Sequence, residues 1–478
     1  MLLLERTERE ALWRQLIEGL EAYTEGISAH RVTPELDPAK VRAYLAAADF
    51  ERPCEPGRAL EFVRDGLWRF QTHVAHPNYY GLFNPAPATM GIAADALVAA
   101  FNPQLAAWSH SPFAIEVEQH LIRALGARFG YDAGSTDGVF CSGGAEANHT
   151  ALLTALAWAC PEYLEQGARA LPRPPVFYVS SESHHSLLKA ARMSGLGMAA
   201  AREIPSDDRL QMDVAALRAA IERDRRAGLA PFMVTATAGT TGAGVVDPIA
   251  AVARVAAEEE LWFHVDAAWG GAAALSPKLR PVLEGIERAD SIIFDAHKWL
   301  SVPMGAGIYL TRHRGILERT FAIVTDYMPR EAAGLDVVDP HKRSIQWSRR
   351  FIGLKVFLSL LVAGWEGYAA AIEHQAAMGD LLREKLRASG WEPVNDTPLP
   401  VVCFVDATRA TGRAAAYLDG IARHVVLSGK AWISTVRLRR TAPALRACIT
   451  NYRTGPEDLD SLVRALEEAR ALNPPPPG

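Results

Sequence analysis

A lysine that directly follows a strand-like segment is the first residue whose type and position suggest chemistry. Lys298 comes after the apolar run Ser291–Phe294 and stands between His297 and Trp299. Near apolar groups a lysine loses its proton more readily, and the neutral amine can form an imine with an aldehyde. A lysine that extends its ammonium group to solvent from a strand end fits the spacing equally well. The position alone leaves both interpretations open.

An acid ends a second apolar run. Asp266 follows Leu261–Val265 and precedes Ala267 and Ala268. A buried carboxylate needs a cation or several hydrogen-bond donors, and the protonated nitrogen of a pyridine ring is such a cation. The two small alanines would leave room for a flat ring. Alternatively, Asp266 could cap a helix or form a structural ion pair. For a single aspartate, without the other motifs, these structural roles are favoured.

Two further segments could bind a flat, phosphorylated ligand. Gly143 and Gly144 precede a helical run, where backbone N–H groups and the helix dipole can hold a phosphate. Most glycine pairs are only turns, and the segment is neither a Walker loop nor a G-x-G-x-x-G sequence. The segment Ser181–Ser186 contains His184 and His185, one of which could stack on a ring or move a proton. Because adjacent histidines face different ways and no acidic ligands surround them, we predict no metal.

The elements that must position these residues alternate between strands and helices. Helices are predicted over Asp213–Arg226 and Pro248–Glu259, the second with Asp247 as its N-cap. The alternation predicts a mostly parallel sheet with helices on both faces, in which ligands lie beyond the carboxyl ends of the strands. The predicted strands are Val176–Val179, Phe232–Ala236, Leu261–Val265, Ser291–Phe294 and Gly307–Leu310.

A chain of 478 residues is longer than one hydrophobic core supports, so several domains are expected. A long loop over Thr325–Arg343 is followed by two predicted helices, Phe351–Val362 and Glu366–Ala388. The predicted units are a helical N-terminal segment over 1–84, a large domain over 85–355, a small α+β domain over 356–472 and a Pro-rich tail over 473–478.

Composition argues against several classes of function. The formal net charge is -5 and the pI is about 6.3, so electrostatics give no case for nucleic acid or an anionic membrane surface. The apolar runs are broken by glycine, proline or charge before they reach membrane-spanning length. The five cysteines are scattered and form no C-x-x-C pair, which is typical of reduced thiols. We expect a cytoplasmic protein without nucleic-acid or membrane partners.

In their order along the chain, these motifs resemble the group II pyridoxal-phosphate-dependent amino-acid decarboxylases. The resemblance extends from about His76 to Arg453, and His185, Thr241, the sequence His-Val-Asp-Ala-Ala and the sequence His-Lys-Trp-Leu carry it. It implies the aspartate-aminotransferase-like fold, fold type I of the pyridoxal-phosphate enzymes, with pyridoxal 5'-phosphate held by the large domain. It also implies a homodimer.

The resemblance implies a role for each matching position. Lys298 would hold the cofactor as a Schiff base, Asp266 would pair with the ring nitrogen, and His185 would stack on the ring. Tyr327, on the long loop, would be a catalytic tyrosine that reaches the neighbouring subunit's site. The other implied cofactor contacts are Gly143, Gly144, Thr241, Ala268 and His297, and the implied substrate contacts are Phe83, Gln104, Trp108 and Arg446.

The implied reaction is decarboxylation of an L-amino acid, with aromatic substrates favoured, to an amine and carbon dioxide. It would pass through a quinonoid that Asp266 stabilises, and Tyr327 would return a proton to Cα. Related enzymes with phenylalanine at the loop position make aldehydes by oxidative decarboxylation and deamination. The tyrosine therefore favours simple decarboxylation, and the oxidative reaction is the alternative.

Two departures from the aromatic decarboxylases bear on the substrate and on the phosphate. Asp295 and Ala296 stand where those enzymes commonly carry Asn-Pro, and an anion beside a phosphate is unfavourable, so Asp295 is given no phosphate role. Gln104 and Ala106 indicate a roomier or more polar pocket than aromatic-specific members have. A non-aromatic substrate such as 2,4-diaminobutyrate or glutamate is therefore an alternative.

Overall fold

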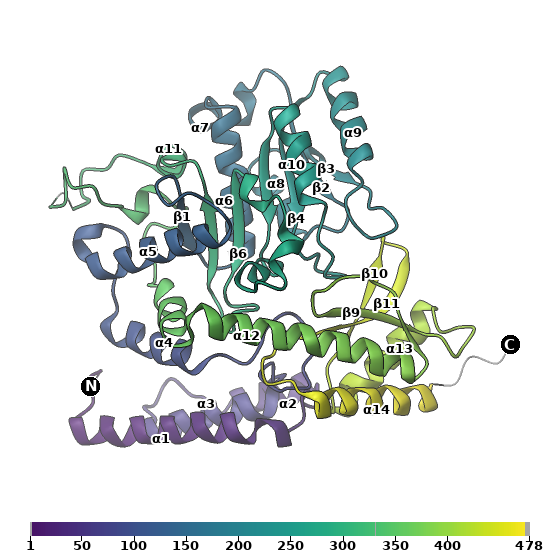
Figure 1. Ribbon diagram of the computed structural model, residues 1–478. Helices are drawn as coiled ribbons and strands as arrows, with labels where there is room; N and C mark the ends of the chain where they lie inside the picture. The colour runs from purple at the N-terminus through teal and green to yellow at the C-terminus, as the bar shows by residue number, and fades with distance from the viewer. Residues whose placement is uncertain (1, 330, 474–478) are drawn as a thin grey trace.

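The structure is a computed structural model that describes residues 2–329 and 331–473. A seven-stranded sheet with its helices forms the upper part of the molecule in Figure 1, and a small sheet lies at the lower right. The strands of the large sheet are β1 (Asp137–Cys141), β2 (Pro175–Ser180), β3 (Ala201–Ile204), β4 (Ala230–Thr237), β5 (Trp262–Asp266), β6 (Ser291–Asp295) and β7 (Gly307–Thr311). Those of the small sheet are β8 (Trp391–Pro393), β9 (Val401–Asp406), β10 (Ser434–Leu438) and β11 (Ala442–Cys448).

Helices precede, separate and follow these strands. The first group is α1 (Arg6–Gly26), α2 (Pro38–Leu45), α3 (Pro56–Phe70), α4 (Thr89–Phe101) and α5 (Pro112–Arg128). The helices between strands of the large sheet are α6 (Gly144–Ala159), α7 (Tyr163–Gln166), α8 (Ser186–Met193), α9 (Val214–Arg226) and α10 (Ile249–Glu258). The last are α11 (Ile316–Phe321), α12 (Gly353–Ala388), α13 (Ala415–Ser428) and α14 (Pro456–Leu472).

The predicted α/β class and mostly parallel sheet are confirmed. The strand order is β1-β7-β6-β5-β4-β2-β3, and only β7 runs antiparallel to its neighbours. The small sheet, in the order β10-β11-β9-β8, is antiparallel throughout. All five predicted strands are present, and β1 and β3 were not predicted. The carboxyl ends of β1, β2, β4, β5 and β6 consequently lie at one edge of the large sheet.

Both faces of the large sheet are covered, as the alternation of strand residues shows. In β6, Ile292 and Phe294 belong to a core cluster that also contains Leu125 of α5 and Val252 of α10. Ile293, between them, belongs to a separate cluster with residues of α6 and α11. Because successive side chains of a strand point to opposite faces, the two clusters are the two faces of one sheet.

Two aspartates that precede helices behave differently. Asp213, the first residue of the predicted helix Asp213–Arg226, is the N-cap of α9, since its Oδ1 accepts from the N–H groups of Ala215 and Ala216 at 2.9 and 3.0 Å. The prediction that Asp247 caps the next helix is wrong. Its carboxylate instead accepts from the backbone N–H of Met212 at 2.7 Å and of Thr237 at 2.8 Å. Burial raises the pKa of Asp247 to about 7.

The two helices predicted over Phe351–Val362 and Glu366–Ala388 form α12, which bends between them. Gly364 has φ 63° and ψ 177°, which is not helical and which glycine adopts without strain. By length and composition, α12 is the one helix of the described part that could cross a membrane. It contacts α4, α5 and α14, and 22% of its apolar stretch is buried within the chain. One such helix is weak evidence for a membrane span.

The N-terminal helices bury little within their own chain. None of the residues of α1, α2 and α3 is buried, although Trp13, Ile17, Val63 and Leu67 are large and apolar. These helices lie along the bottom of Figure 1. At the other end of the chain, the predicted Pro-rich tail lies outside the described residues apart from Asn473.

A fully buried ion pair joins α5 to the segment that leads into α12. Glu118 and Arg349 have side chains 2% and 3% exposed, and their closest N–O distance is 2.7 Å. Glu118 Oε1 also accepts from the backbone N–H of Gly353 at 3.0 Å. Removing one partner would leave a buried charge without compensation.

We therefore expect Glu118→Ala to lower the free energy of unfolding by about 3–5 kcal/mol, measured by urea unfolding. The matched control is Glu10→Ala, because Glu10 forms an exposed pair with Arg6 and should contribute less than about 0.5 kcal/mol. Equal effects of the two substitutions would contradict this interpretation of the buried pair.

Candidate active site

A cavity of about 340 Å³ opens where the carboxyl ends of the strands meet. The segments after β1, β2, β4, β5 and β6 all contribute to it, together with the loop before α4 and strand β11. Its lining residues are Leu82, Phe83, Asn84, Gly144, Ala145, Asn148, His184, Ser186, Thr237, Gly239, Thr241, Asp266, Ala268, Trp269, Asp295, His297, Lys298, Met304 and Arg446. The structure thus brings together most of the residues that the sequence singled out.

Lys298 points into this cavity and is paired with an acid. Its Nζ lies 2.9 Å from Oδ2 of Asp295 and 6.0 Å from the ring centroid of Phe83. The lysine side chain is 23% exposed, and the aspartate side chain is 2% exposed. The amine is therefore accessible from the cavity while its counter-ion is buried behind it.

Asp266 is buried, and its partners are neutral donors. Oδ1 accepts from the backbone N–H of Ala268 at 3.1 Å, and Oδ2 accepts from Nδ2 of Asn148 at 2.9 Å. The structure shows no salt bridge to this carboxylate within the described residues. It therefore presents its negative charge to the cavity, where a cationic ring nitrogen would find a partner.

Asn148 belongs to a chain of hydrogen bonds whose donor order can be assigned. Its Nδ2 also donates to Ser186 Oγ at 2.8 Å, so its Oδ1, 3.0 Å from Nε2 of His264, must accept. The other nitrogen of His264 then accepts from Ser291 Oγ at 2.8 Å. Burial lowers the pKa of His264 to about 4, with the charge of Asp266 opposing the shift. His264 is thus a neutral imidazole that orients Asn148.

The same chain ends on His184. Ser186 Oγ accepts from Asn148 and lies 2.9 Å from Nδ1 of His184, and the backbone N–H of Ser186 donates to the same nitrogen at 3.2 Å. Nδ1 is therefore an acceptor, and the proton of the neutral ring is on Nε2. Burial lowers the pKa of His184, while the nearby charge of Asp266 raises it and that of Lys298 lowers it.

The two adjacent histidines are placed differently in the structure. Both side chains are exposed, but only His184 is among the described residues that line the cavity, while His185 stands at the N-cap position of α8. Ser186 holds the His184 ring through its Oγ and its backbone N–H, and Ser186 Oγ is itself fixed by Asn148 of α6. His184 is thus the imidazole that this structure places at the cavity, and the stacking role that the resemblance implies for His185 stays a prediction.

The start of α6 offers hydrogen-bond donors that suit a phosphate. Gly144 begins α6, and a Cβ built on it would lie 2.8 Å from Asp295 Oδ2 and 3.4 Å from Cβ of Ala268. Gly143 precedes it and lies close to His297, whose Nδ1 accepts from the N–H of Ala306 at 3.1 Å. Nε2 of His297 then carries the proton and lies 3.9 Å from Asp295 Oδ2. Backbone N–H groups at the start of α6 and this imidazole are suitable phosphate donors.

Arg446, at the end of β11, brings a cation from the small sheet to the cavity. Its Nε donates to the carbonyl of Thr241 at 3.0 Å, and Nη1 donates to that of Gly81 at 3.2 Å. Nη2 is buried and has no hydrogen-bond partner within the described part of the chain. The guanidinium lies 4.7 Å from the ring centroid of Phe83, a residue with φ 66°. An anionic group of a ligand would satisfy the remaining donor.

Three predicted residues lie away from the cavity of their own chain. Gln104 contacts Ser348 through Nε2, and the indole of Trp108 donates to Glu116 at 2.9 Å. Tyr327 is 75% exposed and stacks on Trp347 with the ring centroids 6.0 Å apart. The single chain therefore does not bring these side chains to Lys298.

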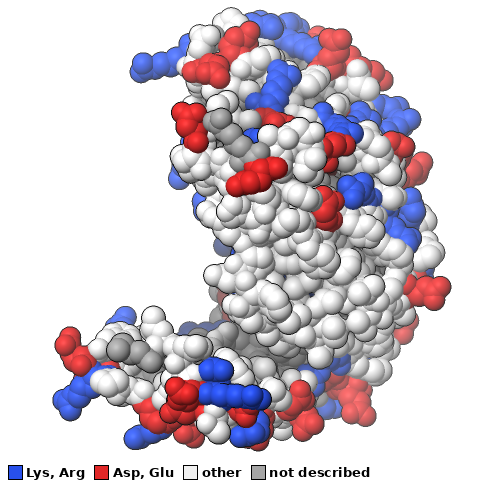
Figure 2. All heavy atoms as spheres, turned by 90° about the vertical axis from the view of Figure 1, so that its left-hand side faces the viewer, with Lys and Arg blue, Asp and Glu red and all other residues white. Residues whose placement is uncertain are grey.

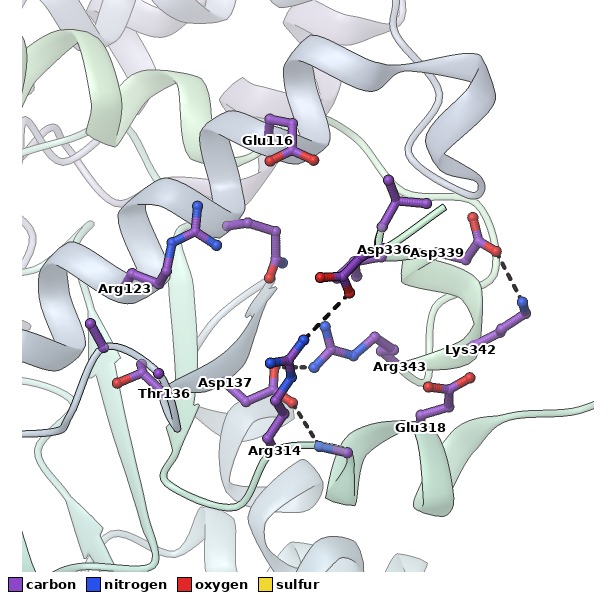
Figure 3. Close-up of a pocket in the computed structure, with 16 residues that line it drawn as sticks. Glu116, Arg123, Thr136, Asp137, Arg314, Glu318, Asp336, Asp339, Lys342 and Arg343 are labelled. Carbon is purple, nitrogen blue, oxygen red and sulfur yellow. Dashed lines mark hydrogen bonds and ion pairs between the residues drawn. The ribbon is translucent and has the colours of Figure 1, made fainter. Parts of the chain in front are cut away.

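A second cavity, of about 470 Å³, lies beneath the loop that carries Tyr327 and is drawn in Figure 3. Arg343 pairs with Asp137 of β1 on its floor, and the backbone N–H of Gly315 donates to the same carboxylate at 3.2 Å. Its charged lining residues are Glu116, Arg123, Asp137, Arg314, Glu318, Asp336, Asp339, Lys342 and Arg343. Because acidic and basic side chains are nearly balanced in this lining, the cavity has no preference for an anionic or a cationic ligand. The ion pair between Arg343 and Asp137 holds the end of the Thr325–Arg343 loop against β1.

Sequence reasoning missed Asn148 as a member of the site, left the choice between His184 and His185 open on the residues alone, and gave Asp295 no role. Asn148 is one residue of an apolar helix, and only its contacts with Asp266 and His264 distinguish it. The sequence did contain a signal for Asp295. An acid that ends a strand three residues before a lysine can form an ion pair with that lysine.

The two histidines provide a matched test. We expect His184→Ala to weaken binding of pyridoxal phosphate by about tenfold or more, because the ring would lose its stacking partner. His185→Ala should leave the affinity within about twofold of the wild type, since surface substitutions have small effects. Fluorescence titration of the apoproteins measures both affinities. A larger loss in His185→Ala would contradict the placement of the two rings.

The cavity fits pyridoxal phosphate in each of its chemical groups. Lys298 can meet an aldehyde, Asp266 a protonated ring nitrogen, and the glycines at the start of α6 a phosphate. Two buried polar atoms that lack partners in the described chain, Asp295 Oδ1 and Arg446 Nη2, lie at the same cavity.

Comparison with known proteins agrees with this chemistry. Residues 43–406 match the family described as the pyridoxal-dependent decarboxylase conserved domain. The aromatic-L-amino-acid decarboxylase of Bacillus atrophaeus is 30% identical over 98% of this chain and 97% of its own length. The cysteine sulfinic acid decarboxylase of Mus musculus is 32% identical over 70% of this chain and 68% of its own. The crystal structure of Oryza sativa TDC with PLP and tryptamine superposes with a TM-score of 0.90 at 25% identity, covering 98% of this chain and 99% of that one. The chain therefore belongs to the group II pyridoxal-phosphate-dependent amino-acid decarboxylases, and pyridoxal phosphate is its cofactor.

Proposed function

We propose that this decarboxylase acts on L-amino acids with an aromatic side chain and releases the amine and carbon dioxide. The observation that carries the proposal is the balance of charge in the cavity. Lys298 and Arg446 are the only lysine and arginine among the described lining residues, and Asp266 and Asp295 are the only acids. Lys298 is needed for the cofactor, which leaves Arg446 as the single cation for a substrate carboxylate.

An acidic substrate would bring two carboxylates to this one arginine. If Arg446 meets the α-carboxylate, the second carboxylate has no cation among the described lining residues, and its desolvation is not compensated. A basic side chain would find Asp266 facing the cofactor and Asp295 buried behind Lys298, with 1% of its surface exposed. A neutral side chain meets neither difficulty.

The apolar part of the cavity supports an aromatic group. Leu82, Phe83, Trp269 and Met304 line it, and the rings of Phe83 and Trp269 are 4.8 Å apart at 41°. Aromatic rings pack favourably in such tilted arrangements. Gln104, which suggested a more polar pocket, does not line the cavity of its own chain.

Each residue that lines the cavity then has its own role in the proposed decarboxylation. Pyridoxal phosphate, when bound, supplies an aldehyde for an amine and a ring that accepts the electrons of the broken bond. Asp266, oriented by Asn148, keeps the ring nitrogen protonated, and His184 supports the face of the ring. Arg446 orients the substrate carboxylate. Trp269 and Phe83 exclude water from that side of the cavity.

The substrate class is tested with the purified holoenzyme and a panel of L-amino acids. We expect amine and carbon dioxide from tyrosine, tryptophan or phenylalanine, with kcat/KM at least about a hundredfold above that for glutamate, cysteine sulfinate and 2,4-diaminobutyrate, because buried unpaired charge is costly. Product chromatography and carbon dioxide release measure it. Preferred turnover of an acidic or basic member would refute the aromatic assignment.

We further propose that a second copy of this chain completes the site. Figure 2 shows a broad face, seen from the side of α4 and α5, on which uncharged surface occupies the middle and charged side chains gather at the edges. Large exposed apolar side chains lie on α4, α5 and α12, namely Leu97, Phe101, Phe113, Leu361 and Val362. Such a surface, together with N-terminal helices that bury no residue, is typical of a subunit interface.

Tyr327 is proposed to act across this interface as the proton donor to Cα. We expect Tyr327→Phe to lower amine formation by about 100-fold or more, because general-acid catalysis contributes on that order. In the presence of dioxygen as the oxidant, aldehyde, ammonia and hydrogen peroxide should appear in place of the amine, and product analysis measures all three. Tyr44→Phe removes a hydroxyl that donates to a backbone carbonyl far from the cavity and serves as the control. Unchanged amine formation in Tyr327→Phe would refute its role.

Mixing two inactive variants tests whether the loop acts in the neighbouring site. Lys298→Ala and Tyr327→Ala subunits, exchanged at equal concentration, should recover about one quarter of wild-type activity, since half of the dimers are mixed and each has one intact site. Light scattering should give twice the chain mass of 52.0 kDa. Recovery of no activity from proven mixed dimers would show that the tyrosine acts in its own chain.

A further inference from the structure

Asp295 holds a carboxylate in a place where an asparagine would keep the same shape without charge. It ends β6, and its backbone N–H donates to the carbonyl of Ala268 at 2.9 Å. Lys298 follows three residues later, and its N–H donates to the carbonyl of Asp295 at 3.1 Å. This turn fixes the two side chains on the same side of the strand end.

Few groups of the described chain neutralise the negative charge of Asp295 or donate a hydrogen bond to it. Asp295 is 1% exposed, and its Oδ1 has no hydrogen-bond partner within the described residues. Oδ2 lies 2.9 Å from the ammonium of Lys298 and 3.9 Å from Nε2 of His297. Burial lowers the pKa of His297, although the charge of Asp295 opposes the shift, so this ring is a weak counter-ion. Lys298 is therefore the main counter-ion.

This pairing has a consequence for the chemistry of Lys298. Only an amine that has left its ion pair has a lone pair free to attack a carbonyl carbon, and Nζ of Lys298 lies 2.9 Å from the buried carboxylate of Asp295. For the reaction, Lys298 must leave Asp295 and release one proton to solvent. Nζ then forms a C=N bond with the aldehyde carbon, and the aldehyde oxygen leaves as water.

We propose that Asp295 is the docking partner of Lys298 whenever the lysine is not bonded to the cofactor. It slows the capture of a carbonyl compound by the apoprotein, and it receives the lysine when an amino acid displaces it. Asp295 is thus a positioning residue that acts through Lys298. The proposal depends on the cofactor but not on the identity of the substrate.

Stopped-flow mixing of the apoprotein with excess aldehyde tests this role without any turnover. The rate of imine formation is followed by absorbance for pyridoxal phosphate and, separately, for pyridoxal, which lacks the phosphate. We expect Asp295→Asn to capture both aldehydes at least about tenfold faster than the wild type, because the ammonium loses its buried counter-ion. Asp460→Asn, which removes the acid of the Lys385–Asp460 pair and changes the net charge equally, should leave both rates unchanged.

Two results would overturn the proposal. Equal rates in wild type and Asp295→Asn would show that the ion pair does not restrain Lys298. A faster rate with pyridoxal phosphate but not with pyridoxal would show that Asp295 acts on the phosphate and not on the lysine. Thermal unfolding of the apoproteins verifies that the variants are folded. If Asp295→Asn does not fold, Asp295→Ser, which is smaller and uncharged, carries the same expected acceleration and the same refuting outcomes.

Discussion

Two buried carboxylates end neighbouring strands of the sheet, and the arrangement of the site follows from how each is compensated. Asp266 ends β5 and receives neutral donors from Asn148 and Ala268, so its charge remains available to a cation in the cavity. Asp295 ends β6 and is neutralised by Lys298. Had both been paired with cations of the chain, the cavity would offer no negative charge to a ring nitrogen. The absence of a side chain at Gly144 follows from the same crowding, because a Cβ there would lie 2.8 Å from Asp295.

The polar groups beneath the cavity form one ordered sequence of donors and acceptors. The indole of Trp262 donates to Ser291 at 2.9 Å, and the sequence continues through His264 and Asn148 to Asp266 and His184. Each heavy atom in it has a defined role because His264 stays neutral and Asn148 can be oriented in only one way. A network of this kind makes Asp266 and His184 rigid relative to each other, which is what a site preorganised for a flat ring requires.

The chain presents surfaces that its own fold does not cover. The N-terminal helices α1–α3 bury none of their residues, and apolar side chains of α4, α5 and α12 face solvent. Tyr327 lies on the same loop that Arg343 anchors to β1. The second copy of the chain that we propose would cover the apolar face and receive the loop.

The residue pattern by itself determined the class of fold, the strands that end at Asp266 and shortly before Lys298, and the division of the long helix into the segments Phe351–Val362 and Glu366–Ala388. Each of these depends on local properties: hydrophobic runs, strand-end polarity and the conformational freedom of glycine. Only the tertiary structure decided that His184 and not His185 faces the cavity, that Asp247 bonds to Met212 and Thr237 and does not cap a helix, and that Asn148 joins the site. The direction of a side chain at a turn depends on hydrogen bonds to residues distant in sequence, and no local pattern contains those partners.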